Sequence, residues 1–151
     1  MGQTLSFGPL TYVPTSVEAE LLEHAVELLN PGTPLTSAER AREAGRLHYQ
    51  NFAATPYGRL LARAMPNDFK QLMLRARFVA RHVFRNMQFS SEDLGGPGVA
   101  VEMRNSGYPP EHFAGLFEEW MRTFGLAQPS VMLRVQKDDT HRYELRWNDT
   151  T

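Results

Sequence analysis

The chain has 151 residues, of which 42% are hydrophobic and 22% charged, and its formal net charge is −1. Such a length suits one domain with a sizeable hydrophobic core, and the balanced charge gives no general attraction to a polyanion. The absence of cysteine excludes disulfides and zinc–thiolate sites. No apolar run approaches the roughly 18 residues of a membrane span, and the first residues lack a signal-peptide pattern. We therefore expect a cytoplasmic protein.

Helical patterns fill the first half of the chain. Residues 1–15 include two prolines and predict an extended lead-in. Apolar residues at three- and four-residue spacing then predict a helix over 16–30, which an Asn-Pro-Gly triplet ends. A second helix is expected from Thr36 or Ser37 to about Ala53, with a glutamate three residues after Thr36 as part of a capping box.

Two more helices are expected before strand patterns begin at residue 88. Thr55 followed by Pro56 predicts the cap and first turn of a short third helix, which ends before Met65. Asn67 is then expected to cap a fourth helix over 68–87. The apolar stripe of that helix is the most regular in the chain.

Strand patterns dominate from residue 88 onward. Residues 87–94 and 99–103 predict two strands joined across a glycine-rich connection. A fifth helix is expected over 110–124. Apolar and polar residues then alternate over 131–136 and again over 142–147, which predicts a second strand pair.

These elements predict an α+β fold: about five helices with a small antiparallel sheet in the C-terminal half, and one helix inserted between the strand pairs. We expect residues 1–151 to form a single domain. Within it, the lead-in of 1–15 is followed by a helical layer over 16–87 and by a sheet plus helix over 88–147.

The stretch from Gly45 to Leu61 connects two of the expected helices and contains two Gly-Arg pairs, which begin at Gly45 and Gly58. A glycine inside a helix costs roughly 1 kcal/mol relative to alanine. Close packing of one helix backbone on another would compensate for that cost. We therefore expect Gly45 and Gly58 to let two helices cross closely.

The same stretch supplies four candidates for a ligand pocket: His48, Tyr49, Phe52 and Tyr57. One interpretation is a pocket for a flat or apolar ligand, with His48 as a conceivable axial haem ligand. The other is that the aromatic side chains are simply part of the core, which is the commoner fate of aromatic residues at helical spacing.

Catalytic and metal chemistry receive little support. The five histidines are scattered, and no two stand four residues apart on one helix; they are His24, His48, His82, His112 and His141. There is no phosphate-binding loop, no dinucleotide fingerprint and no nucleophile elbow. The carboxylate pairs are adjacent in sequence, so they diverge rather than form a dyad. We predict no catalytic residue, no metal, no cofactor and no enzymatic activity.

A basic stripe is expected on the fourth helix. Arg77, Arg81 and Arg85 are spaced by four, and Lys70 lies further back on the same face. This stripe predicts a surface that binds an anion or an acidic partner. The alternative is a solvated face, or one paired with the glutamates of the first helix.

Several segments together resemble a large myxobacterial paralogous family of domain-of-unknown-function proteins. The resemblance rests on GPLTYVPTSVEAELLEHAV (8–26), SAERAREAGRLHYQNFAATPYGRLL (37–61), residues 108–125 and RYELRW (142–147). This chain differs from the family pattern in being shorter around 30–36. It also carries Leu-His where the family signature has a second arginine.

The order of elements is similar, at the level of fold, to ligand-binding domains of the haem-nitric-oxide, vinyl-reductase and transport-particle type. A resemblance of fold does not carry function with it. The Tyr-x-Ser-x-Arg porphyrin motif of the haem members is absent from this sequence.

We interpret the chain as a non-enzymatic regulatory domain in signalling, which recognises a protein partner or a small ligand. One alternative is a sensor that buries an apolar or haem-like cofactor between the helices and the sheet. Another is nucleic-acid binding through the basic stripe, which the near-zero net charge disfavours. A protein partner is the expected partner, with a small ligand and a homo-oligomer as further alternatives, and no membrane span is expected.

Overall fold

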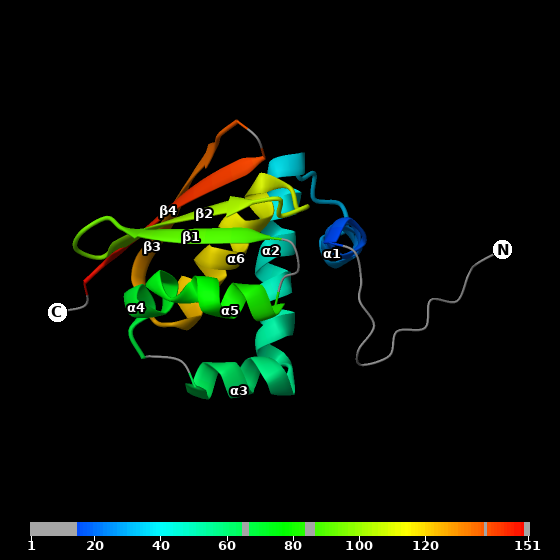
Figure 1. Cartoon of the computed structure of the whole chain (residues 1–151). Helices are drawn as coiled ribbons and strands as arrows, with labels where there is room; N and C mark the ends of the chain where they lie inside the picture. The colour runs from blue at the N-terminus through cyan, green and yellow to red at the C-terminus, as the bar shows by residue number, and fades with distance from the viewer. Residues whose placement is uncertain (1–14, 65–66, 84–86, 138, 150–151) are drawn as a thin grey trace.

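The computed structural model describes residues 15–64, 67–83, 87–137 and 139–149, so the predicted lead-in over 1–15 lies, apart from Thr15, outside the described residues. Within them the chain forms six α-helices and a four-stranded antiparallel sheet (Figure 1). In chain order the elements are α1 (Thr15–Leu29), α2 (Ser37–Ala54), α3 (Pro56–Ala64), α4 (Phe69–Leu74), α5 (Ala76–Val83), β1 (Gln88–Asp93), β2 (Gly98–Arg104), α6 (Pro110–Thr123), β3 (Ala127–Val135) and β4 (Thr140–Asn148).

The sheet has the strand order β1-β2-β4-β3, with every neighbouring pair antiparallel. β1 and β2 form the predicted hairpin across the glycine-rich connection, and β3 and β4 form the predicted pair at the end of the chain. α6 lies between these pairs in sequence. The α+β fold with one inserted helix is therefore confirmed.

The two faces of the sheet differ in chemistry, as the alternation of residue types predicts. On one face, Val101 of β2 stands opposite Tyr143 of β4 and both are fully buried. On the other, Arg142 of β4 makes ion pairs with Glu92 and Glu102 at 3.0 and 3.2 Å. α4, α5 and α6 pack on the apolar face, so that face of the sheet is one wall of the core.

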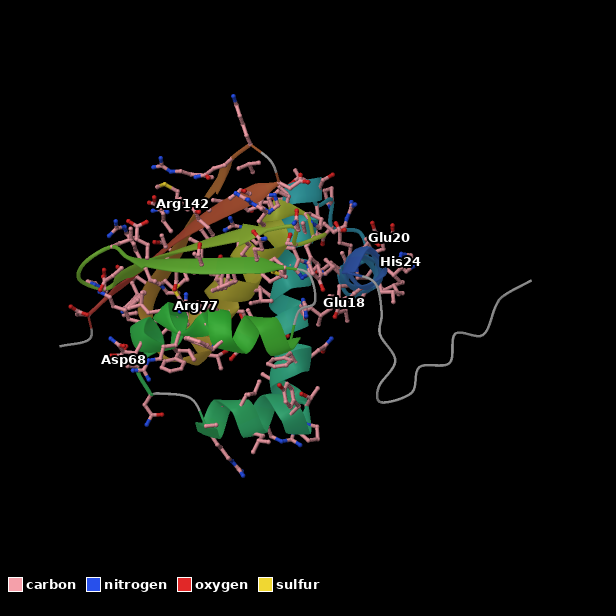
Figure 2. All side chains as sticks on the ribbon, in the orientation of Figure 1. Glu18, Glu20, His24, Asp68, Arg77 and Arg142 are labelled. Carbon is pink, nitrogen blue, oxygen red and sulfur yellow. The ribbon has the colours of Figure 1, made fainter. Side chains whose placement is uncertain are left out.

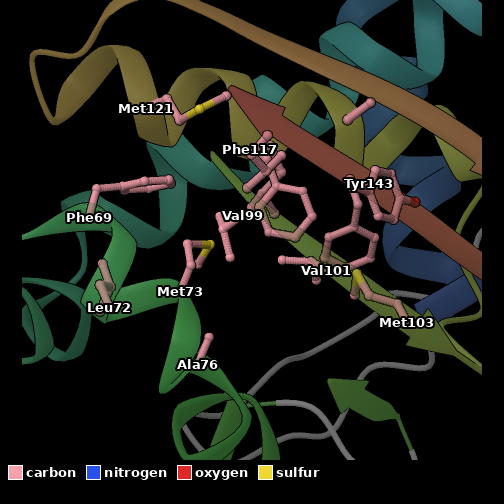
Figure 3. Packing of buried hydrophobic residues seen from close by; sticks show 14 of the residues in the cluster. Phe69, Leu72, Met73, Ala76, Val99, Val101, Met103, Phe117, Met121 and Tyr143 are labelled. Atoms are coloured by element: carbon pink, nitrogen blue, oxygen red, sulfur yellow. The ribbon is translucent and has the colours of Figure 1, made fainter. Parts of the chain in front are cut away.

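The core lies between the sheet and the helices (Figure 3). Phe117 of α6 packs its ring edgewise against Tyr143, with the ring centroids 5.3 Å apart. Phe69 of α4 lies at the other side of the cluster, where its ring meets Trp120 and Trp147 edge to face. Edge-to-face contacts of this kind stabilise an aromatic cluster beyond simple burial.

α2 and α6 cross with almost no space between their backbones. A Cβ atom added to Gly45 would lie 1.7 Å from the carbonyl oxygen of His112, and one added to Gly115 would lie 1.8 Å from the carbonyl oxygen of Arg42. Only glycine fits at either position. The prediction that Gly45 allows a close helix crossing is thus confirmed, and its partner in α6 is another glycine.

Gly58 also sits at a close approach, but within one helical corner rather than between distant helices. A Cβ there would lie 2.1 Å from the carbonyl oxygen of Phe52. The N–H of Gly58 donates to the hydroxyl of Thr55, which caps α3 as predicted. Gly58 therefore holds α3 against the end of α2.

Helix starts follow the predicted caps with one correction. Thr36 and Glu39 form the full capping box at the start of α2. The predicted cap of the fourth helix at Asn67 is wrong, because the side chain of Asp68 accepts the N–H of Gln71 instead.

The prediction of one continuous helix over 68–87 is also wrong. The helix breaks at Arg75, whose backbone has φ −103° and ψ 0°, and this break gives the sixth helix. The carbonyl of Leu74 accepts a hydrogen bond from the hydroxyl of Ser91 on β1. The break turns α5 along β1 while Ala76 stays buried, so the apolar surface of both short helices remains on the core.

Candidate functional site

A cavity of about 470 Å³ lies among α2, α3, the short helices α4 and α5, α6 and the apolar face of the sheet. This volume falls within the roughly 300–1,000 Å³ typical of small-molecule pockets. Its lining comes from His48, Tyr49, Phe52, Ala53, Gly58, Arg59, Leu61, Ala62, Arg63, Leu72, Ala76, Ala80, Phe89, Met103, Phe113, Leu116, Phe117, Trp120, Thr123 and Phe124. Most of these side chains are apolar, so the cavity favours an apolar guest.

Three of the four predicted pocket residues line this cavity: His48, Tyr49 and Phe52. Tyr49 stacks on Trp120 of α6 with ring centroids 5.7 Å apart, and burial, followed by the charge of Glu119, raises its pKa. Tyr57 is outside the lining set. Its ring is half exposed and stands edgewise against Phe52, so it supports the corner between α2 and α3.

His48, in the wall of the cavity, belongs to a polar cluster. Its Nδ1 lies 2.9 Å from Nε2 of His112 on α6, and its Nε2 lies 3.5 Å from a carboxylate oxygen of Glu18 on α1. The hydroxyl of Tyr108 donates to the other oxygen of Glu18. Figure 2 shows Glu18 on the side of α1 that faces the body of the molecule, whereas Glu20 and His24 point outward. The cluster therefore links α1, α2 and α6.

The protonation of this cluster follows from burial. Burial lowers the pKa of His48, against the carboxylate of Glu18, which raises it. Burial, and then the proximity of His48, lower the pKa of His112 to about 3. Both imidazoles are therefore neutral at pH 7. The proton order that suits the carboxylate has His112 Nε2–H donating to His48 and His48 Nε2–H directed at Glu18.

Nδ1 of His112 has no hydrogen-bond partner and is fully buried among the described residues. In the proton order above, this nitrogen is a bare acceptor rather than a donor. A charged His112 would place an unsatisfied N–H in the core, where an unpaired polar group costs about 1–3 kcal/mol. The packing around His112 therefore favours the neutral form of the two imidazoles.

Two arginines of α3, Arg59 and Arg63, also line the cavity. Both side chains are exposed as well, so they stand where the cavity meets solvent. The guanidinium of Arg59 donates to the backbone carbonyl of Ala54. These arginines give the cavity a positive rim.

The predicted basic stripe is divided by the helix break. Lys70 lies on α4, where its ammonium group pairs with Asp93 at 2.6 Å and donates to the carbonyl of Gly96. This pairing, together with the N–H of Gly95, lowers the pKa of Asp93. Lys70 therefore holds α4 to the β1–β2 connection, and the expectation that it shares one helix face with the arginines is wrong.

Arg77 lies exposed on α5, with its guanidinium 4.8 Å from the ring centroid of Phe78. The side chain of Arg81 and the whole of Arg85 lie outside the described residues. The structure thus brings three pocket candidates together and separates Lys70 from Arg77. A role of the stripe in partner binding stays a prediction.

Sequence reasoning missed the histidine pair and the arginine rim. His48 and His112 are 64 residues apart, and only the crossing of α2 and α6 brings them together. The signal that could have found the pair is the glycine in each helix, Gly45 and Gly115, which marks the contact. Arg59 and Arg63 show the spacing of one helical face, but nothing local tells which way that face points.

No group of three or more side chains in the described ranges has the arrangement of a metal site. The same ranges contain no helix long and apolar enough to cross a membrane.

The family model described as "Protein of unknown function (DUF2378)" matches residues 1–148. The chain belongs to this family. The resemblance to a family of domains of unknown function is confirmed to that extent, and the myxobacterial origin stays a prediction. Among curated proteins, none matches the chain.

Solved structures of H-NOX proteins share the fold. The Fe(II) unliganded H-NOX protein from K. algicida is 13% identical, with a TM-score of 0.66, over 96% of this chain and 79% of that chain. The H-NOX protein from S. oneidensis in the Fe(II)NO ligation state is 9% identical, with a TM-score of 0.68, over 98% of this chain and 83% of that chain. A mutant of T. tengcongensis H-NOX is 16% identical, with a TM-score of 0.62, over 97% of this chain and 81% of that chain. The similarity confirms the predicted analogy of fold, and of fold alone.

Proposed function

We propose that this chain is a non-enzymatic sensor domain that binds an apolar organic ligand in the cavity between its helices and its sheet. The observation that carries the proposal is the cavity itself, about 470 Å³ in volume and lined mainly by aromatic and aliphatic side chains. The shared fold with H-NOX proteins supports a ligand-binding role, because the K. algicida protein is an Fe(II) unliganded form and the S. oneidensis protein is in the Fe(II)NO ligation state. A cytoplasmic location and a role in signalling belong to the same proposal.

Haem itself does not fit the histidine at this cavity. His48 is the one histidine among the described lining residues, and both of its ring nitrogens face other groups, His112 and Glu18. An axial ligand needs a ring nitrogen directed at the iron. The proposal is therefore a ligand held by packing rather than by coordination through His48.

Ligand binding would act on the short helices. α3 buries only Gly58 among its described residues, and its Leu60 is exposed over 63% of its surface. Segments with few buried contacts open and close most easily. A ligand in the cavity would add apolar contacts to α3, α4 and α5. A regulatory partner protein would then bind to the surface that these contacts change. Recognition of a protein partner thereby follows ligand binding.

The test is native mass spectrometry and absorbance spectroscopy of the purified chain, with titration by the neutral fluorescent dye Nile red. We expect a retained small molecule or saturable dye uptake in the wild type. Ala80→Leu fills part of the cavity and should weaken binding at least tenfold. Ala64→Leu, on α3 but outside the lining, is the matched control and should bind as the wild type does.

Two results would count against the proposal in different ways. If the wild type holds no molecule and takes up no dye, the sensor function is wrong. A Soret band that survives His48→Ala would instead keep the sensor function and replace the organic ligand with haem.

A further inference from the structure

The rim of the cavity has a charge pattern that its apolar walls do not require. Arg59 and Arg63 stand four residues apart on α3, both at the lining and both exposed. Four residues make about one helical turn, so the two guanidinium groups share a face. Two arginines on an ordinary solvated helix face would not need to lie at the edge of an apolar cavity.

Neither guanidinium is neutralised by an acid in the described part of the chain. Among the described residues, the guanidinium of Arg59 donates only to the backbone carbonyl of Ala54, and Arg63 has no carboxylate partner. The described lining residues also include no aspartate or glutamate. Some arginines away from the cavity are paired with acids: Arg42 contacts Glu111 at 2.9 Å, and Arg142 contacts Glu92 at 3.0 Å. Within the described residues, the cavity rim is thus positive without compensation.

We propose that the ligand is an amphiphilic anion, with an apolar chain or ring system inside the cavity and a carboxylate or phosphate between Arg59 and Arg63. This inference rests on the proposed function and adds the chemical class of the ligand. A guanidinium presents parallel N–H donors that match the oxygens of a carboxylate or a phosphate. The apolar body gains from leaving water, and the head group stays at the solvent edge, where its desolvation is small.

The cavity wall at His48 agrees with this orientation. His48 and His112 are neutral, because burial lowers the pKa of both, and the carboxylate of Glu18 stands behind them. The lining there has no cation among the described residues, because His48 is neutral, and the carboxylate of Glu18 lies behind its ring, outside the lining. The charges of the site therefore place the anion at α3.

The experiment is displacement of Nile red from the full chain by four amphiphiles with the same chain length: dodecanoate, dodecyl phosphate, dodecanol and dodecylamine. We expect dodecanoate or dodecyl phosphate, or both, to bind at least tenfold more tightly than dodecanol, and dodecylamine to bind more weakly still. Which of the two anions binds better distinguishes a carboxylate ligand from a phosphate ligand.

The matched variants carry the same change of charge at different places. Arg59→Gln with Arg63→Gln should remove the preference for the anions and leave the affinity for dodecanol unchanged. Arg77→Gln with Arg134→Gln, two exposed arginines outside the lining, should keep the preference.

The outcomes separate the two proposals. Equal affinity of the wild type for dodecanol and both anions would overturn the amphiphilic-anion inference while the sensor function stands. So would a preference that survives the change of both rim arginines. Failure of all four amphiphiles and of the dye to bind would overturn both.

Discussion

The crossing of α2 with α6 and the cavity beside it are built in opposite ways. At the crossing, Gly45 and Gly115 let the backbones touch, and Arg42 joins the helices through Glu111 and Glu118 at 2.9 and 3.3 Å. At the cavity, apolar side chains from short helices surround a space of about 470 Å³. At the crossing the two backbones are in contact and leave no space, whereas the cavity leaves room for a ligand.

The difference assigns a role to each region. The crossing fixes two walls of the cavity, since His48 and Tyr49 of α2 and Phe117 of α6 all line it. The remaining helical walls are α3, α4 and α5, none of them longer than nine residues. The tightly packed pair α2 and α6 thus supports two walls of the site, while the short helices that form the other walls adjust to a ligand. Binding sites are commonly supported by rigid elements in this way.

The largest expected effect is at the crossing. Gly45→Ala would place a Cβ atom 1.7 Å from a backbone carbonyl oxygen, so α2 and α6 must separate. We expect a loss of roughly 3 kcal/mol or more in the free energy of unfolding, measured by chemical denaturation. In an unconstrained helix the same change stabilises by about 1 kcal/mol, so a stabilised variant would show that the helices do not touch there.

Gly32→Ala is the control for this substitution. Gly32 has open space around it, but its φ of +77° disfavours a side chain. We expect a loss of only about 1–2 kcal/mol. A loss equal to that of Gly45→Ala would show that an effect of this size is not specific to the helix crossing.

The second effect is a dependence of stability on pH that comes from His112. Its pKa is about 3 in the folded chain and 6.5 ordinarily, so the unfolded chain takes up the proton first as the pH falls. This contribution is complete above about pH 6.5 and is lost below it. The expected loss is about 1.4 kcal/mol per pH unit, or about 2 kcal/mol between pH 6.5 and pH 5.

Denaturation at a series of pH values measures this slope. His112→Gln should lower the dependence of the unfolding free energy on pH by about 1.4 kcal/mol per pH unit in that range, which corresponds to one proton. An unchanged slope in His112→Gln would show that His112 is not the neutral, buried partner of His48.

The third effect compares one arginine from each region. Arg42→Met removes ion pairs that join α2 to α6, and we expect it to reduce the free energy of unfolding by about 1 kcal/mol. Arg63→Met removes a rim arginine and should change it by less than about 0.5 kcal/mol. Equal losses would indicate that Arg63 has a structural partner and would remove the reason to assign it to a ligand.

The smallest effect is expected on α5. Arg77→Glu with Arg81→Glu tests the basic surface proposed for partner binding. We expect the stability to change by less than about 0.5 kcal/mol, because Arg77 is exposed. Binding of a polyanion such as heparin at low salt should fall. Unchanged heparin binding with the fold intact would show that the stripe is only a solvated face.

Much of the fold follows from local patterns in the sequence. The capping box of Thr36 and Glu39 locates the start of α2, and alternation of apolar residues locates β4 with Tyr143 on its buried face. Gly45 could be read as a crossing point because a glycine inside a helix needs a reason. These features depend on neighbouring residues alone.

The break at Arg75 could not be read in this way. No glycine or proline marks it, and the apolar residues before and after it, Met73 and Ala76, keep the helical spacing. At the break, the hydroxyl of Ser91 on β1 donates to the carbonyl of Leu74, and this contact comes from a strand that no local pattern links to the helix. The cavity likewise could not be predicted from local patterns, because its walls come from helices and strands that lie far apart in the chain. His48, Tyr49 and Phe52 were found from their residue types, but the space between them and the sheet is a tertiary property.

Hydrogen exchange of the whole chain with and without saturating dodecanoate tests the central claim most directly, because it shows where a guest adds protection. We predict slower exchange of backbone amides in α3, α4 and α5, and unchanged exchange where α2 and α6 meet at Gly45 and Gly115. No change in these short helices, or a change confined to α1 and the charged face of the sheet, would contradict the claim that the cavity is the ligand site.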